Sequence, residues 1–473
     1  MANLLKEITF GTDGFRGVIG GEFNYENIRK IAQGFSDWLA YKKFKGPGFK
    51  VFVGYDRRFL SDKFAREFAI VLVNNDIDCT LSKTPVPTPM VSYLTTKDYT
   101  FGIMITASHN NYIYNGVKIK YKGQSIAPHM TAEIEVYVAK NFKSYVSRIP
   151  KKSILEIDLR KEYTDYIDKK FNLRSIFSKI KGKVVFDLMF GSSAEVFNMV
   201  FDGFKNIVTI NSEHDPLFGE YGSPEPVEKR LMRLKEEVKK QKAICGFALD
   251  GDGDRFAVID EYGNYLSPAQ IAPMFLEYLI NFKKMKGRVV QAVSLGFLTQ
   301  RIARANNLLF EFVPVGFKYI ASRISDGGVL FGAEESGGYS WHGNIPERDG
   351  IISSLMILEM VVNLKKSVRE IYRDIEKKYG SSSFIREDFP ISKITNSKYS
   401  FAMKIKSKLP KTIMGKAIGE IITFDGIRVI LENDWWFLIR PSGTEPLLRI
   451  YVETDNLKNS NALMKFAKSL SVF

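Results

Sequence analysis

Apolar residues in the first part of the chain follow two spacings in turn, one typical of strands and one of helices. The run at 101–105 (FGIMI) is continuously apolar, as expected of a short buried strand. The segment at 25–43 places apolar residues three and four positions apart, which predicts a helix. Residues 50–58 then indicate a strand and residues 63–75 a second helix. Strands that alternate with helices predict a layered α/β domain.

The same alternation restarts twice further along the chain. A helical pattern at 159–177 precedes a strand and glycine turn at 182–193, and a third series begins near residue 267. Past residue 380 short strands separated by turns dominate, and a helical stretch at 459–470 follows. We therefore predict the α/β class, with three consecutive similar α/β domains of mixed sheets sandwiched by helices and a smaller α+β domain. The predicted boundaries are 1–150, 151–265, 266–378 and 379–473.

Composition favours a soluble protein of a reducing compartment. No apolar run approaches the ~18 residues that a membrane helix needs, so we expect no membrane partner. The N-terminus lacks a charged segment followed by an apolar core, which argues against a signal peptide. Cys79 and Cys245 lie far apart and form no CxxC motif, so we expect no disulfide and a cytoplasmic location.

The formal net charge of +15 has two interpretations, a nucleic-acid surface or a lysine-rich solvated surface with a basic cleft for a small anion. The lysines are spread along the whole chain instead of forming one block. The sequence has no zinc finger, no RNA-binding aromatic signature and no basic tail. We therefore favour the small anion and predict no nucleic-acid partner.

A candidate nucleophile follows the strand at 101–105. The segment 106–111 reads TASHNN and presents the hydroxyl of Ser108 beside the imidazole of His109. A serine at the end of a buried strand is well placed for chemistry, because the scaffold is rigid and the loop is open. An Asn-Gly turn follows, and then Lys118, on the next strand-like run.

Three aspartates alternate with glycines in the sequence DGDGDR: Asp250, Asp252 and Asp254. Carboxylates this close repel one another unless a cation lies among them, and hard divalent cations take oxygen ligands. An EF-hand is the competing interpretation, since Glu261 falls at its twelfth position. However, Arg255 stands where the EF-hand needs glycine, and both flanks resemble strands. We therefore predict a divalent-metal loop for Mg²⁺.

Several other stretches offer groups that bind anions or hydroxyls. Arg16 lies in the glycine-rich run FGTDGFRG, and Lys318 follows Gly-Phe at an expected junction of loop and helix. Glu334 and Ser336, after a buried strand, suit either sugar hydroxyls or the cap of a following helix. The turn IRPSGTEP predicts a concave site for an anion, with Arg449 on the next strand as a second fork. The residues of this turn that would bind are Arg440, Ser442, Gly443 and Thr444.

One such stretch falls on each of the four predicted domains, which suggests a central cleft where all four meet. In this order, the serine loop, the metal loop, EESGG and RPSGTEP resemble the four active-site loops of the α-D-phosphohexomutase superfamily. The runs FGTDGFRG and VGFK are similar to the family as well. EESGG followed by IPERDG most resembles the bacterial phosphoglucomutase/phosphomannomutase branch.

This resemblance implies a reaction. Ser108 is carried as phosphoserine, and a phosphate oxygen completes the Mg²⁺ site of the three aspartates. The phosphoryl group passes to a hexose 1-phosphate, giving a 1,6-bisphosphate such as glucose 1,6-bisphosphate. After reorientation of this intermediate, Ser108 recovers a phosphoryl group and hexose 6-phosphate leaves.

The resemblance also implies roles for the remaining residues. Glu334 and Ser336 hold the sugar hydroxyls, and the turn at Arg440 holds the phosphate. His109 or Lys118 is the general acid or base, and the sequence does not decide between them. The residues that stabilise charge at the transferring group are Arg16, Lys118, Arg255 and Lys318.

The expected partner is therefore a small-molecule sugar phosphate, with glucose first and mannose next, bound by a monomer or homodimer. The alternatives are a phosphoglucosamine mutase, a metal-dependent sugar-phosphate phosphatase using Ser108, and a basic nucleic-acid- or anion-binding protein without catalysis. Two departures from the family pattern bear on loop stiffness and sugar preference. Asn111 stands where the family has proline, and Asn344 stands where it has histidine, with His342 two residues earlier.

Overall fold

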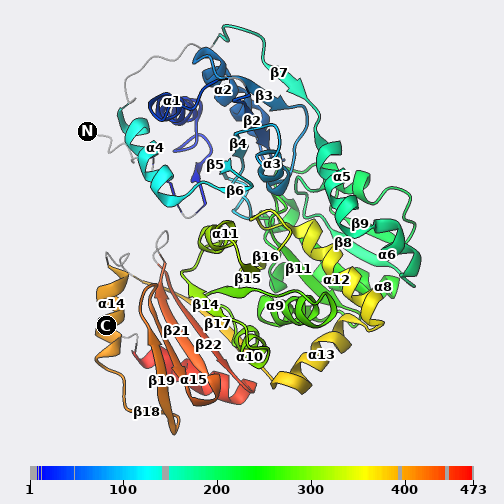
Figure 1. Cartoon of the computed structure of the whole chain (residues 1–473), viewed down its shortest axis with the longest axis vertical. Helices are drawn as coiled ribbons and strands as arrows, with labels where there is room; N and C mark the ends of the chain where they lie inside the picture. The colour runs from blue at the N-terminus through cyan, green and yellow to red at the C-terminus, as the bar shows by residue number, and fades with distance from the viewer. Residues whose placement is uncertain are drawn as a thin grey trace. The chain divides into compact units, whose positions relative to one another are not determined.

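The computed structural model describes residues 8, 10–11, 13–46, 48–140, 149–391, 397–442 and 447–470. The chain forms two compact units. Unit 1 consists of Met1–Leu266 and Gly337–Val368, and unit 2 consists of Ser267–Ser336 and Arg369–Phe473. The elements of both units are labelled in Figure 1.

The first sheet of unit 1 is mixed, in the order β1-β5-β4-β2-β3-β7, with β6 paired to β5 (Figure 1). Strands β2 and β4 are parallel neighbours and wholly buried, because α2 and α3 both pack on them. The elements are β1 (Phe15–Val18), α1 (Tyr25–Tyr41), β2 (Val51–Tyr55), α2 (Ser61–Asn74), β3 (Cys79–Ser82), α3 (Thr88–Leu94), β4 (Phe101–Ile105), β5 (Tyr114–Tyr121), β6 (Gln124–Ser125), α4 (Pro128–Lys140) and β7 (Leu155–Ile157).

The second sheet of unit 1 has the order β12-β11-β10-β8-β9. Strands β10 and β11 form an antiparallel hairpin, and α12 packs against it. The elements are α5 (Arg160–Phe171), α6 (Leu173–Lys179), β8 (Val184–Asp187), α7 (Ala194–Val200), β9 (Ile207–Ile210), α8 (Met232–Gln241), β10 (Cys245–Leu249), β11 (Phe256–Asp260) and β12 (Tyr265–Leu266). The segment of unit 1 that begins at Gly337 adds β16 (Gly338–Trp341), which is not a strand of this sheet, and α12 (Gly350–Leu364).

Unit 2 contains parallel strands in the order β14-β13-β15 with helices packed on them. Strand β15 is buried along its whole length, as its run of apolar residues requires. The elements are α9 (Pro268–Glu277), β13 (Arg288–Ala292), α10 (Leu298–Ala305), β14 (Phe310–Val313), α11 (Phe317–Ser325), β15 (Val329–Glu334) and α13 (Val368–Tyr379).

An antiparallel sheet in the order β17-β22-β21-β20-β19-β18 makes up the rest of unit 2 (Figure 1). Helix α15 packs on β22, β17 and β21, and apolar side chains from helix and strands form one core. The elements are β17 (Ser383–Pro390), α14 (Lys398–Lys406), β18 (Thr412–Ile413), β19 (Lys416–Ile422), β20 (Ile427–Leu431), β21 (Trp436–Pro441), β22 (Leu447–Thr454) and α15 (Leu457–Leu470).

The predicted fold class is confirmed: strands and helices alternate, and a smaller α+β domain follows. The helix expected at 159–177 is instead two helices, α5 and α6. Asn172 adopts a left-handed conformation between them, with φ of 45°, which ends the first helix. The four domain boundaries and the central cleft stay predictions. Among the described residues, no helix is both long and apolar enough to span a bilayer.

Candidate active site

Ser108 lies at the end of β4 in a backbone conformation that few residues adopt. Its φ is 53°, in the left-handed region, and its side chain is fully buried. The hydroxyl donates to Asp250 Oδ2 at 2.9 Å and lies 3.3 Å from His109 Nδ1. Thr106 Oγ1 accepts from the Ser108 backbone N–H at 2.8 Å. The structure thus brings the candidate nucleophile into direct contact with the acidic loop.

Arg58 binds the backbone of the serine loop, and no motif in the sequence pointed to it. Its guanidinium donates to the carbonyl oxygens of Ser108 at 2.6 Å and Asn110 at 2.7 Å. It also donates to those of Asn111 and Tyr114, at 2.9 and 3.0 Å. The side chain is buried, so burial lowers the pKa of Arg58 to about 10. The four carbonyl oxygens that it contacts lie 50 or more residues away along the chain, which leaves no local motif.

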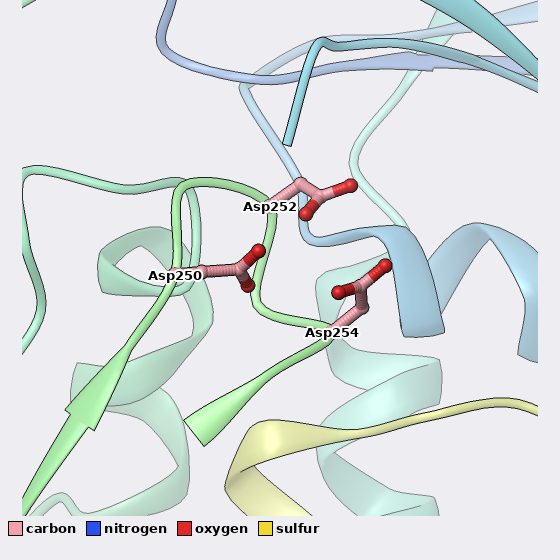
Figure 2. A group of neighbouring side chains, drawn as sticks. All are labelled: Asp250, Asp252 and Asp254. Atoms are coloured by element: carbon pink, nitrogen blue, oxygen red, sulfur yellow. The ribbon is translucent and has the colours of Figure 1, made fainter. Parts of the chain in front are cut away.

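Three buried carboxylates lie on the turn of the β10–β11 hairpin. Figure 2 shows the side chains of Asp250, Asp252 and Asp254 emerging from this one loop. One ligand oxygen from each lies within 4.8 Å of the others. Both flanks of the loop are strands, which supports the rejection of an EF-hand, whose flanks are helices.

The oxygen atoms of this loop fit a divalent cation. Asp252 Oδ1 and Asp254 Oδ1 are buried, and neither accepts a hydrogen bond from any described residue. A buried carboxylate oxygen without a donor is costly unless a cation or water satisfies it. Burial, and then the charges of Asp254 and Asp252, raise the pKa of Asp250 well above its usual range. A bound divalent cation would relieve this repulsion, so these three residues could hold one.

Lys118 on β5 lies among the carboxylates. Its Nζ is 2.8 Å from Asp13 Oδ2, 2.8 Å from Asp252 Oδ2 and 3.0 Å from Asp254 Oδ2. Burial alone would lower the pKa of Lys118, but these three carboxylates more than offset it, and the pKa is raised. Lys118 is therefore a fixed positive charge at this site.

Arg348 is a second buried cation that sequence reasoning did not select. It lies just before α12 and donates to Asp254 Oδ2 at 2.5 Å and to Asp13 Oδ2 at 3.2 Å. The next residue, Asp349, accepts from the backbone N–H of Ile352 at 2.9 Å and so caps α12. The run IPERDG was a family signal, but the contact partners of its arginine cannot be read from sequence.

The remaining predicted residues of unit 1 surround Ser108. Arg16 on β1 donates to Asn110 Oδ1 at 2.6 Å. Arg255 Nε lies 3.7 Å from Asp254 Oδ1, and its backbone N–H donates to Asp250 Oδ1 at 3.0 Å. Burial, followed by the charges of Arg255 and Arg16, lowers the pKa of His109 well below its usual range. The imidazole is therefore neutral near pH 7.

In unit 2, Glu334 ends β15 and is buried, and the Ser336 hydroxyl donates to its carboxylate. The neighbouring Glu335 is held differently. It accepts from Ser294 Oγ at 2.8 Å and from the Tyr451 hydroxyl at 3.2 Å. No helix begins at these residues, so the alternative role as a helix cap is not realised.

Arg440 and Arg449 lie directly opposite each other on the neighbouring strands β21 and β22, and their role as two anion-binding groups stays a prediction. Arg440 Nε donates to Asp425 Oδ2 at 2.9 Å. Ser442 is buried, and its backbone N–H donates to the Leu447 carbonyl at 2.8 Å. Lys318 lies in the first turn of α11, with Nζ 5.5 Å from the Tyr319 ring. Gly443 and Thr444 lie outside the described residues.

Comparison with known proteins decides the family. Family models of phosphoglucomutase/phosphomannomutase match the chain in order: alpha/beta/alpha domain I at 7–144, domain II at 161–263 and domain III at 267–379, then the C-terminal domain at 403–466. A phosphoglucosamine/phosphogalactosamine mutase of Sulfurisphaera tokodaii is 30% identical over 473 residues, covering 98% of each chain. The chain belongs to the phosphoglucomutase/phosphomannomutase family. It is thus an isomerase of the phosphohexomutase type.

Two further relatives of this family are similar over nearly their whole length. The phosphoglucosamine mutase of Methanococcus vannielii is 29% identical over 469 residues, covering 98% of each chain. The crystal structure of a phosphomannomutase-like protein of Thermus thermophilus has a TM-score of 0.84 at 30% identity. That match covers 98% of this chain and 99% of the other.

Proposed function

We propose that the protein interconverts glucosamine 6-phosphate and glucosamine 1-phosphate, in place of the glucose phosphates that the sequence first suggested. The observation that carries this choice is that two of the three relatives named above are called a phosphoglucosamine/phosphogalactosamine mutase and a phosphoglucosamine mutase. The buried Glu334 supports it, because a carboxylate at the sugar loop suits the ammonium group of a hexosamine.

The proposed chemistry begins with Ser108 as phosphoserine. The bond between phosphorus and Ser108 Oγ breaks while a bond from phosphorus to a sugar hydroxyl oxygen forms. The hydroxyl proton leaves to the neutral imidazole of His109, because Lys118 is already protonated, and the Ser108 oxygen recovers a proton as it is released. The bisphosphate then reorients, and its other phosphoryl group returns to Ser108. A catalytic amount of a hexose 1,6-bisphosphate, such as glucose 1,6-bisphosphate, primes the serine.

Positively charged groups near Ser108 would offset the negative charge of the transferring phosphoryl group. Mg²⁺ held by Asp250, Asp252 and Asp254 would neutralise charge on the transferring group. Lys118 binds Oδ2 of both Asp252 and Asp254, while Oδ1 of each carboxylate accepts no hydrogen bond from the described residues. The lysine therefore keeps both carboxylates in one orientation. Arg58 fixes the loop that presents Ser108. This arrangement suits phosphoryl transfer, where positioning and electrostatics provide most of the catalysis.

The test compares kcat/KM for glucosamine, glucose and mannose phosphates, with Mg²⁺ and a trace of hexose 1,6-bisphosphate. We expect glucosamine phosphate to be preferred over glucose phosphate by about tenfold or more, equal to ~1.4 kcal/mol. Ser108→Ala should abolish turnover of all three. A preference for glucose phosphate would restore the first interpretation. Release of inorganic phosphate without isomer formation would favour the phosphatase alternative.

A further inference from the structure

Asp425 of unit 2 lies where three separate segments of that unit meet. It precedes β20 and is buried, with 4% of its surface exposed. Its Oδ2 accepts from Arg440 Nε at 2.9 Å and from the backbone N–H of Val315 at 2.9 Å. Its Oδ1 accepts from Lys398 Nζ at the start of α14. One carboxylate is thus fully engaged by two cations and a backbone amide.

The turn that contains Asp425 packs directly against the backbone of Arg440. Gly426 has φ of +88°, which side chains other than glycine rarely tolerate. A Cβ at this position would lie 2.5 Å from the Ile439 carbonyl oxygen and 2.9 Å from Arg440 Cα. The turn can therefore approach this closely only with glycine at position 426. The close approach sets the distance between the side chains of Asp425 and Arg440.

The contacts of Asp425 reach two predicted anion-binding elements. Arg440 begins the turn RPSGTEP, and its guanidinium plane is fixed when Nε is bonded, because the side chain can no longer rotate freely. Val315 begins the run VGFK, which leads through Gly316, with φ of 130°, to Lys318 on α11. Asp425 thus links the arginine of one element to the backbone of the other.

The charge of Asp425 is maintained by its partners. Burial alone would raise the pKa of Asp425, but Arg440 and Lys398 more than offset it, and the pKa is lowered. A buried carboxylate held in this way is a fixed partner and not a titrating one near neutral pH.

We propose that Asp425 is a positioning residue for phosphate recognition. It holds the Arg440 guanidinium and the loop at 315–318 in one arrangement, so that both meet the same phosphate group of the substrate. This proposal rests on the proposed function, which makes the turn at Arg440 a phosphate site. Asp425 itself, being negative and fully engaged, does not contact the phosphate.

The sign of the effect distinguishes positioning from simple electrostatics. Asp425→Asn removes a negative charge beside an anion site, so Coulomb attraction alone predicts tighter phosphate binding. The positioning role predicts the opposite. Arg440 and Lys398 donate to different oxygens of Asp425, and asparagine offers one uncharged oxygen in their place, so one bond is lost and the other loses its charge assistance. We expect the inhibition constant of inorganic phosphate and the KM for sugar phosphate to rise about tenfold, as expected for loss of one charge-assisted hydrogen bond.

Asp434→Asn is the matched control. Asp434 also joins the two parts of unit 2, with Arg301 Nε at 2.9 Å and Arg304 Nη2 at 3.0 Å. It touches neither anion-binding element in these contacts, so the variant should change the inhibition constant less than about twofold. The midpoint of thermal unfolding of both variants shows whether a general loss of structure explains the result.

Phosphate binding to wild-type protein is measured by calorimetry, independently of turnover. If no hexose phosphate is isomerised, the proposed function fails, while the comparison of the two variants still tests Asp425. If Asp425→Asn binds inorganic phosphate as tightly as wild type or more tightly, the positioning role is wrong. Equal weakening in both variants would also overturn it.

Discussion

Arg58 contacts the serine loop at four backbone carbonyl oxygens, those of Ser108, Asn110, Asn111 and Tyr114. The left-handed conformation of Ser108 costs about 1–3 kcal/mol of backbone strain, and it persists only where the surrounding structure imposes it. The guanidinium supplies that constraint with donors in a rigid plane, which the single ammonium of lysine cannot reproduce.

We therefore predict that Arg58→Lys lowers kcat by about tenfold or more, one lost charge-assisted contact being worth ~1.5–3 kcal/mol. It should also lower the yield of phosphorylated Ser108 after incubation with hexose 1,6-bisphosphate, measured by mass spectrometry. The control is Arg57→Lys, since Arg57 is similarly buried but donates to Glu195 and to the carbonyl oxygens of Ser212 and Glu213. Equal phosphorylation in both variants would contradict this role.

Asp187 at the end of β8 offers a prediction on pH. Burial raises its pKa from 3.8 to about 6, although Met189 N–H and the Asn211 amide donate to its Oδ1. Because the folded pKa is raised, its contribution to stability is full below pH 3.8 and is lost as pH rises through 6. Two pKa units correspond to about 3 kcal/mol.

Asp187→Asn keeps an oxygen for both donors and removes the titration. We expect the wild-type free energy of unfolding, minus that of the variant, to fall by about 2.4 kcal/mol between pH 4 and pH 7, because part of the full change has already occurred at pH 4. Urea unfolding at several pH values measures this difference. A difference that does not change with pH would show that the carboxyl is not forced to ionise inside the protein.

At the scale of elements, the metal loop depends on its contact with the loop after β8. Gly253 has φ of +73°, and a Cβ there would lie 2.2 Å from Ser193 Oγ. That hydroxyl is buried and makes no hydrogen bond to the described residues. A side chain at position 253 would therefore require the Ser193 hydroxyl to move or the two loops to separate.

Gly253→Ala should cost about 2 kcal/mol or more of unfolding free energy, from strain at positive φ and from this clash. Ser193→Ala removes the clashing oxygen while leaving the strain. In a double-mutant cycle, the alanine at 253 should therefore cost about 1 kcal/mol less in the Ser193→Ala background. Additive costs would mean that the loops separate to accommodate the new methyl group.

The sequence predicted elements well where one pattern sufficed. The apolar run at 101–105 is β4, and the spacing of Asp250, Asp252 and Asp254 on a hairpin turn brings their carboxylates together without long-range information. Arg58, Arg348 and Asp425 were missed because each acts through partners 15 to 335 residues away. Such contacts depend on how strands and turns pack, which periodicity does not encode. The catalytic and binding roles assigned from the motifs stay predictions.

At the scale of the whole molecule, the two proposed ligand sites belong to different compact units. The carboxylate loop lies in unit 1, and Asp425 with Arg440 lies in unit 2. A ligand that binds only the native state stabilises the structure that holds it, by about 2.7 kcal/mol at 100 times its dissociation constant. Each ligand should therefore leave its own pattern of protection against amide hydrogen exchange.

We predict that Mg²⁺ slows exchange in unit 1, at the β10–β11 turn and at Thr88, whose N–H donates to the Asp252 carbonyl at 2.8 Å. For amides that exchange only after the ion leaves, the exchange rate should fall by about 100-fold when Mg²⁺ is present at 100 times its dissociation constant. Asp252→Asn should remove the effect, because it takes one carboxylate from the set of three. Inorganic phosphate should instead slow exchange in unit 2, at the turn before β20. If Mg²⁺ protected both units equally in wild type and in Asp252→Asn, its binding would not involve the carboxylate loop, and the metal site assigned there would be wrong.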